Sequence, residues 1–161
     1  MLFRSQMLAL AKVAQLRRQA DAPITDWAEV VRQLALDLAP LMAERELDVG
    51  VDLAPAPVRA HEWSLRELTR NLLHNAIKHG ARHTTLNIEL RTDGRHAALT
   101  VADEGSGIDQ VQRQRLFQPF AVGDTRSGSG LGLAICHDIV LALGGQIELN
   151  NRLHEIGRAH V

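Results

Sequence analysis

The chain has 161 residues, of which 45% are hydrophobic, so it can bury one core and has little room for a second. Its formal net charge of -1 creates no field that would attract nucleic acid or an anionic membrane, and we expect neither as a partner. Cys136 is the single cysteine, which excludes an internal disulfide and a cysteine metal cluster.

Both ends of the chain have an unusual sequence. The strings "MLFRS" at the start and "EIGRAHV" at the end can be encoded by DNA strings that are reverse complements and that resemble a common sequencing adapter. We therefore expect residues 1–5 and 155–161 to be translated adapter around a native segment, residues 6–154. The alternative is an ordinary terminus at each end. The source nucleotide sequence decides between the two, because other codons would refute the adapter.

The first half of the chain predicts two helices and a strand. Residues 6–20 place apolar side chains on one stripe of a helix that needs a partner helix. Asp26 can cap a second helix, with Glu29 three residues later completing a capping box, and Pro40 should kink this helix. Residues 48–53 then alternate as a short strand before the linker "APAP".

The second half predicts a helix, a hairpin, and a further helix and strand. From about residue 64 to 79 apolar residues return at helical spacing, and Gly80 can end this helix. The runs "TTLNIEL" and "AALTVAD" flank an Asp93-Gly94 turn signal and predict a β-hairpin that ends at Asp103. A short helix near 109–116, a glycine-rich loop, a helix from about 131 to 143 and the strand "QIEL" complete the native part.

The polar face of the helix at 64–79 is rich in amides. Asn71 and Asn75, four residues apart, place two side-chain amides on the same side, and Lys78 lies beside them. Amide oxygens suit Mg²⁺, which takes few protein ligands and keeps phosphate oxygens and water, while Lys78 can meet phosphate charge. Alternatively, this face is only a solvated helix surface.

The strand that ends at Asp103 runs into a second acidic residue and closely spaced glycines, "VADEGSGID" at 101–109. The Asp103 carboxylate can accept a hydrogen bond from an exocyclic amine such as that of adenine, and Gly105 and Gly107 would let the ring approach the backbone. The alternative is a surface turn residue. A glycosidase pair of Asp103 and Glu104 is disfavoured, because neighbouring strand residues point to opposite faces.

A second glycine cluster, "RSGSGLGLAI" at 126–135, opens the helix expected at 131–143. Free backbone N–H groups and the positive end of the helix dipole favour a phosphate at such a place, although a flexible loop before a helix has the same pattern. The cluster does not fit the dinucleotide-binding fingerprint, since Leu133 stands where the third glycine belongs. No P-loop pattern occurs in the chain.

The order of these motifs is more specific than any one of them. In sequence, "NLLHNAIKHG", "DEGSGI", "LFQPF" and "GSGLGLAI" resemble the N, G1, F and G2 boxes of the catalytic ATP-binding domain of sensor histidine kinases, in the superfamily that also holds gyrase, Hsp90 and MutL. The resemblance covers roughly residues 45–150, and "MLALAKVAQLRR" resembles the end of the second helix of the family's dimerisation hairpin. It implies an α/β fold, a two-layer sandwich of a mixed sheet with helices on one face.

The resemblance also implies the domain boundaries. Residues 1–20 would hold the adapter-like start and the remnant of the dimerisation hairpin. Residues 21–154 would be the catalytic ATP-binding domain without its last strand, and 155–161 the adapter-encoded tail.

Individual residues take roles from the same resemblance, with ATP and Mg²⁺ as the ligands. Asn75 would be the metal ligand, and Asn71, Lys78 and Arg126 would act on the phosphates as catalytic residues. Asp103 would read the adenine amine. The other implied nucleotide contacts are His79 beside the nucleotide, Gly105 and Gly107 lining the base pocket, Phe117 and Phe120 anchoring the lid, and Gly128, Gly130, Leu131 and Gly132 at its hinge and phosphate-binding end.

One departure within the superfamily bears on the reaction. Members that hydrolyse ATP place a Glu four residues before the metal-binding Asn, where this chain has Asn71, and an amide cannot act as a general base. The resemblance therefore implies transfer of the γ-phosphoryl group to a histidine, with catalysis through positioning and charge neutralisation. The alternatives are a module that only binds nucleotide and an ATP hydrolase, against which Asn71 argues.

The acceptor histidine implied by the family stands in a motif like H-E-L-R-T-P, which this chain lacks. The string "HEWSLR" at 61–66 begins similarly, but it opens the asparagine-bearing helix and has no Thr-Pro. We therefore expect a fragment whose partners are its own missing hairpin and a response regulator receiver domain. The parent would be a dimeric kinase of the bacterial inner membrane, with this domain on the cytoplasmic side.

Overall fold

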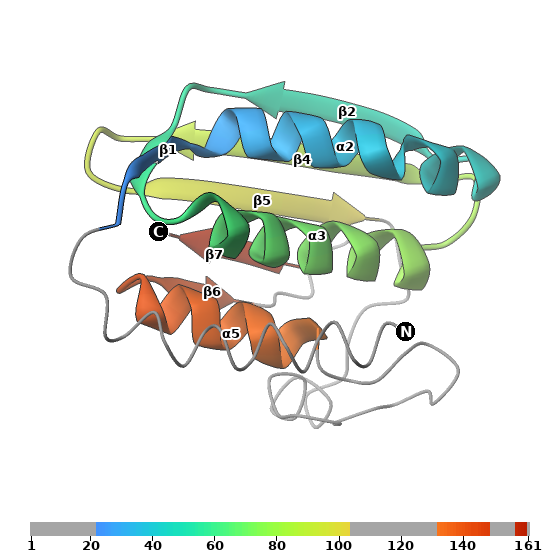
Figure 1. Cartoon of the computed structure of the whole chain (residues 1–161). Helices are drawn as coiled ribbons and strands as arrows, with labels where there is room; N and C mark the ends of the chain where they lie inside the picture. The colour runs from blue at the N-terminus through green and yellow to red at the C-terminus, as the bar shows by residue number, and fades with distance from the viewer. Residues whose placement is uncertain (1–21, 104–131, 149–156, 161) are drawn as a thin grey trace.

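The computed structural model describes residues 22–103, 132–148 and 157–160 (Figure 1). The elements in chain order are β1 (Ile24–Asp26), α2 (Trp27–Glu44), β2 (Asp48–Leu53), β3 (Pro57–Arg59), α3 (Glu62–His79), β4 (Thr85–Thr92), β5 (Ala97–Asp103), α5 (Gly132–Ala142), β6 (Gln146–Glu148) and β7 (Gly157–His160). The helices predicted at 6–20 and 109–116, and with them the hairpin remnant, lie outside the described residues.

Five of the described strands form one mixed sheet in the order β2-β4-β5-β7-β6. β2 pairs with β4 in parallel, and β4 and β5 form the predicted antiparallel hairpin, in which Leu86 lies opposite Asp103. Asp93 closes the hairpin turn, because its carboxylate accepts hydrogen bonds from the backbone N–H groups of Arg95 and His96. β1 and β3, which the sequence pattern did not indicate, form a separate two-stranded sheet.

The helices cover one face of the main sheet. Figure 1 shows α2, α3 and α5 on the same side of it, with α3 between the other two. Alternate residues of β5 are buried against this layer, from Ala97 through Leu99 and Val101 to Asp103. The predicted two-layer α/β sandwich is therefore confirmed.

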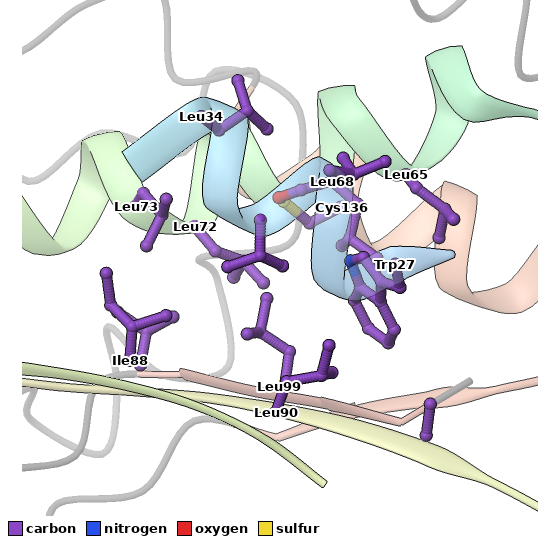
Figure 2. Close-up of a cluster of buried hydrophobic side chains, with 14 of the residues drawn as sticks. Trp27, Leu34, Leu65, Leu68, Leu72, Leu73, Ile88, Leu90, Leu99 and Cys136 are labelled. Carbon is purple, nitrogen blue, oxygen red and sulfur yellow. The ribbon is translucent and has the colours of Figure 1, made fainter. Parts of the chain in front are cut away.

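The core lies between the sheet and the helices, as Figure 2 shows for side chains such as Trp27, Leu68 and Leu99. The apolar face of α3 supplies Leu65, Leu68, Leu72, Leu73, Ala76 and Ile77, all buried. Full burial of each leucine stabilises the fold by roughly 1.5–3 kcal/mol. Because this face must point inward, the amide-rich face of α3 points away from the core.

The N-terminus of α2 is fixed by side-chain hydrogen bonds. Asp26 caps the helix by accepting a hydrogen bond from the Ala28 N–H at 3.1 Å. Glu29, expected in a capping box, instead accepts hydrogen bonds from the side chains of Arg32 and Gln33. The helix continues through Pro40 to its last residue, Glu44.

Strand β7 occupies the position between β5 and β6 and is antiparallel to both. It falls within residues 155–161, the tail that we expect to be adapter-encoded. Strand pairing uses backbone groups that every residue except proline carries, so the pairing does not tell where these residues come from. Their origin stays a prediction for the nucleotide sequence to test.

Candidate functional site

Three segments from distant parts of the chain each have one end at the same side of the molecule. Figure 1 shows the end of β5, the C-terminal half of α3 and the start of α5 together there, with α3 and α5 antiparallel. Midway along the two helices, Cys136 Sγ donates a weak hydrogen bond to the Leu68 carbonyl at 3.6 Å. Four residues before Cys136 is Gly132, the first residue of α5, which is therefore level with the turn of α3 that carries Asn71.

The Asn71 side chain has a defined orientation on α3. Its Nδ2 donates a hydrogen bond to the Glu67 carbonyl, one turn earlier, at 2.7 Å. This bond leaves Oδ1 as the acceptor that faces outward. Asn75 and Lys78 continue along the same helix face, and all three side chains are partly buried.

Asp103 is the most deeply buried carboxylate among the described residues, with 4% of its surface exposed. It stands on the same face of β5 as Leu99 and Val101, and it therefore points toward the helices. This burial excludes the alternative that Asp103 is a surface turn residue.

Gly80, directly after α3, packs against Asp103. A Cβ added to Gly80 would lie 3.2 Å from Asp103 Oδ2 and 2.8 Å from the Ala76 carbonyl oxygen. Gly80 ends the helix as expected, since it follows the last helical residue, but its φ of -68° is one that any residue adopts. A side chain at position 80 would therefore collide with the Ala76 carbonyl oxygen and crowd the Asp103 carboxylate.

Positive charge gathers at the C-terminal end of α3, where Lys78 and His79 lie in the last turn. A positive charge on either side chain is stabilised by the negative end of the helix dipole. His74, which shares the face of Asn71 and Lys78, has a pKa lowered first by burial and then by the charges of Lys78 and His79. The lowered pKa favours the neutral imidazole, and the spacing of the histidines along the chain indicated no role for His74 at the site.

The described part of the predicted site consists of Asn71, Asn75, Lys78, His79, Asp103 and Gly132. The other predicted contacts lie outside the described residues: Gly105, Gly107, Phe117, Phe120, Arg126, Gly128, Gly130 and Leu131. The described residues place a buried carboxylate at a strand end, next to the last turn of a helix that carries two amides and a cation.

Comparison with known proteins identifies the family. A sequence profile described as "Histidine kinase-, DNA gyrase B-, and HSP90-like ATPase" matches residues 60–158. The chain belongs to this ATPase family. Among its relatives, sensor histidine kinase YcbM of Bacillus subtilis is 34% identical over 113 residues, which cover 66% of this chain and 36% of YcbM. The ATPase domain therefore spans about a third of that relative's length.

Solved structures of histidine kinases have the same fold as the ATPase domain. Histidine kinase AdeS of Acinetobacter baumannii superposes with a TM-score of 0.78 at 24% identity, over 96% of this chain and 75% of that chain. Full-length ShkA in complex with AMPPNP superposes with a TM-score of 0.76 at 25% identity, over 97% of this chain and 34% of ShkA. The predicted resemblance to the catalytic ATP-binding domain of sensor histidine kinases is confirmed.

Within residues 22–103 and 132–148, no helix has both the length and the apolar character that crossing a membrane requires.

Proposed function

We propose that the ATPase domain binds ATP with Mg²⁺ beside α3 and passes the γ-phosphoryl group to a histidine on a separate hairpin domain. The observation that carries this proposal is the burial of Asp103 at the end of β5, against Gly80 and the last turn of α3. A buried carboxylate is a strong acceptor for one exocyclic amine and rejects a base that presents a carbonyl instead. Adenine carries that amine, whereas guanine carries a carbonyl at the equivalent position.

The donor set on α3 fits a magnesium-bound triphosphate. Asn75 would ligate the metal through its amide oxygen, Asn71 presents Oδ1 beside it, and Lys78 would neutralise phosphate charge. When bound, Mg²⁺ would supply charge neutralisation of the phosphates and a fixed geometry for them. The amide oxygens are neutral, and the triphosphate would supply the charged oxygens that Mg²⁺ also needs, which supports this assignment.

The same residues favour transfer over hydrolysis. The Asn71 side chain is an amide, which has no basic group at neutral pH, so it cannot take a proton from water. In the proposed reaction the bond between the γ-phosphorus and the bridging oxygen breaks, a bond from phosphorus to an imidazole nitrogen forms, and ADP leaves. The domain would act by positioning and by charge neutralisation.

The partners in this proposal follow from the relatives, which are sensor kinases. They are the dimerisation hairpin with its acceptor histidine and the receiver domain of a response regulator. The parent would be a homodimer in the bacterial inner membrane, with this domain in the cytoplasm. These statements concern the longer protein, of which the chain would be one part.

The base-recognition step is tested by titrating ATP and GTP calorimetrically into the parent and into Asp103→Ala. We expect the parent to prefer ATP, and the variant to lose about tenfold or more of that preference, because the amine loses a buried acceptor. Asp37→Ala is the matched control, since Asp37 is an exposed carboxylate on α2. An unchanged ATP/GTP preference in Asp103→Ala would overturn the base-reading role.

The transfer step is tested by adding a hairpin domain with its histidine and γ-labelled ATP. We expect label on the hairpin histidine and little free phosphate. Nucleotide binding without transfer would support the second candidate, a module that only binds nucleotide. Free phosphate without a labelled protein would indicate a hydrolase.

A further inference from the structure

The C-terminal turn of α2 is joined to the loop after α3 by several hydrogen bonds. We call residues 44–46 the α2 turn and residues 80–83 the α3 loop. The backbone N–H of His83 donates to the Arg45 carbonyl at 3.2 Å, and Arg82 Nη2 donates to the Glu44 carbonyl at 2.9 Å. Glu46 and His83 also approach each other, with 2.9 Å between Oε2 and Nδ1. The two segments therefore hold each other in place.

Among the side-chain contacts between these two segments, the one that Arg45 makes is the most buried. Its Nη2 donates to the Gly80 carbonyl at 2.6 Å, between residues 35 positions apart in the chain. Its Nε is buried and makes no hydrogen bond within residues 22–103, 132–148 and 157–160. Because the buried side of the guanidinium makes no hydrogen bond to water, its hydrogen bond to the Gly80 carbonyl contributes more to holding the side chain in place. This bond is also of the stronger kind, since its donor is charged.

Gly80 connects this arginine to the base-reading carboxylate. Its carbonyl accepts the Arg45 hydrogen bond, and its Cα lies close to Asp103, since a Cβ added there would be 3.2 Å from Asp103 Oδ2. Glycine has no side chain that could absorb a displacement, so a shift of its backbone passes directly to the carboxylate. Small errors in the position of a recognition group have large effects on affinity.

We propose that Arg45 is a positioning residue for nucleotide-base selectivity, acting through Gly80 on Asp103. The inference rests on the proposed function, because it takes Asp103 as the group that reads the base. Arg45 itself would not touch the nucleotide. It stands ahead of residues 60–158, the segment that the family profile matches, so the sequence motifs of the site do not include it.

The test compares Arg45→Met, Arg45→Lys and the control Arg82→Met by calorimetry with ATP and GTP. Arg45→Met should lower the ratio of ATP to GTP affinity about fivefold or more, since the Gly80 carbonyl loses a charged donor. Arg45→Lys should keep the ratio within about twofold, because an ammonium can donate to the same carbonyl. Arg82→Met removes an arginine-to-carbonyl bond from the same loop without involving Gly80, and it should leave the ratio unchanged.

A second readout needs no nucleotide. In amide NMR spectra of the free protein, Arg45→Met should shift the signals of Gly80 and Asp103, whereas Arg82→Met should leave the Asp103 signal in place. If Arg45→Met does not fold, Arg45→Gln replaces it, because a shorter neutral amide cannot keep the charged hydrogen bond to the Gly80 carbonyl, and the ratio should fall in the same direction.

The outcomes separate the two proposals. A parent that binds ATP selectively, together with an Arg45→Met variant of equal selectivity, would overturn the positioning role alone. An equal loss of ATP and GTP affinity in Arg45→Met would also overturn it, since that result indicates a general structural role. A folded parent with no ATP binding would overturn the proposed function, and the unliganded Asp103 signal would then decide whether Arg45 positions the carboxylate.

Discussion

The hydrogen bond between Trp27 and Thr69 joins α2 to α3, the helix that carries most of the candidate site, and it allows a quantitative prediction. Trp27 Nε1 donates to Thr69 Oγ1 at 2.9 Å, and both residues are 0% exposed. Thr69→Val keeps the shape of the side chain and removes the acceptor, so the indole N–H stays buried without its partner. The cost of such a group is about 1–3 kcal/mol.

A mid-range loss of about 2 kcal/mol corresponds to a fall in Tm of about 4–8 °C for a chain of this size. Calorimetry gives the Tm, and urea titration followed by tryptophan fluorescence gives the free energy of unfolding. The matched control is Thr84→Val, which removes a solvent-exposed hydrogen bond to the Ala81 carbonyl. We expect this control to change the free energy of unfolding by less than about 0.5 kcal/mol.

The result that would refute the reasoning is a Thr69→Val protein as stable as the Thr84→Val control. A double-mutant cycle with Trp27→Phe gives a further check, because a real bond makes the two losses non-additive. Thr69→Val should not alter the ATP/GTP affinity ratio of the folded protein, which separates this stability effect from the positioning effect proposed for Arg45.

Three further predictions concern residues on or next to α3. Asn75→Ala should lower the Mg²⁺-dependent affinity for ATP about tenfold while changing the free energy of unfolding by less than about 1 kcal/mol, and equal affinity by calorimetry would contradict the metal role. Because the pKa of His74 is lowered in the fold, the unfolded chain takes up a proton first as the pH falls below the ordinary value of 6.5. The parent should thus lose more stability between about pH 7 and 5 than His74→Gln, and parallel urea curves would refute this. Burial and then the charge of Glu67 raise the pKa of Cys136, so alkylation by iodoacetamide should proceed only as fast as the protein unfolds; labelling at the rate of a small thiol would disprove it.

The elements of the fold were largely predictable because their signals are local. The alternation of residues 48–53 and the runs around Asp93 predicted β2, β4 and β5. Burial of one face repeats every two residues in a strand and about every 3.6 in a helix, so a window of sequence contains it. β1 and β3 escaped prediction because strands as short as Ile24–Asp26 and Pro57–Arg59 carry too few residues for a pattern.

Part of the candidate site was predictable for the same reason. Asn71 and Asn75 share a face through helical spacing alone, and Asp103 was placed at a strand end by the alternation of β5. Whether Asp103 is buried or a surface turn residue was open, because burial depends on what packs against the strand end.

The sequence by itself thus determined the three helices that the structure describes, the longer strands and the family. Only the tertiary structure decided that residues 157–160 pair between β5 and β6, that Gly80 lies against Asp103, and that Arg45 reaches Gly80 across the fold. These relations join residues far apart in the chain, and they are set by the packing of the helices on the sheet. Local periodicity does not predict such contacts, because it reflects only which face of a single helix or strand is buried.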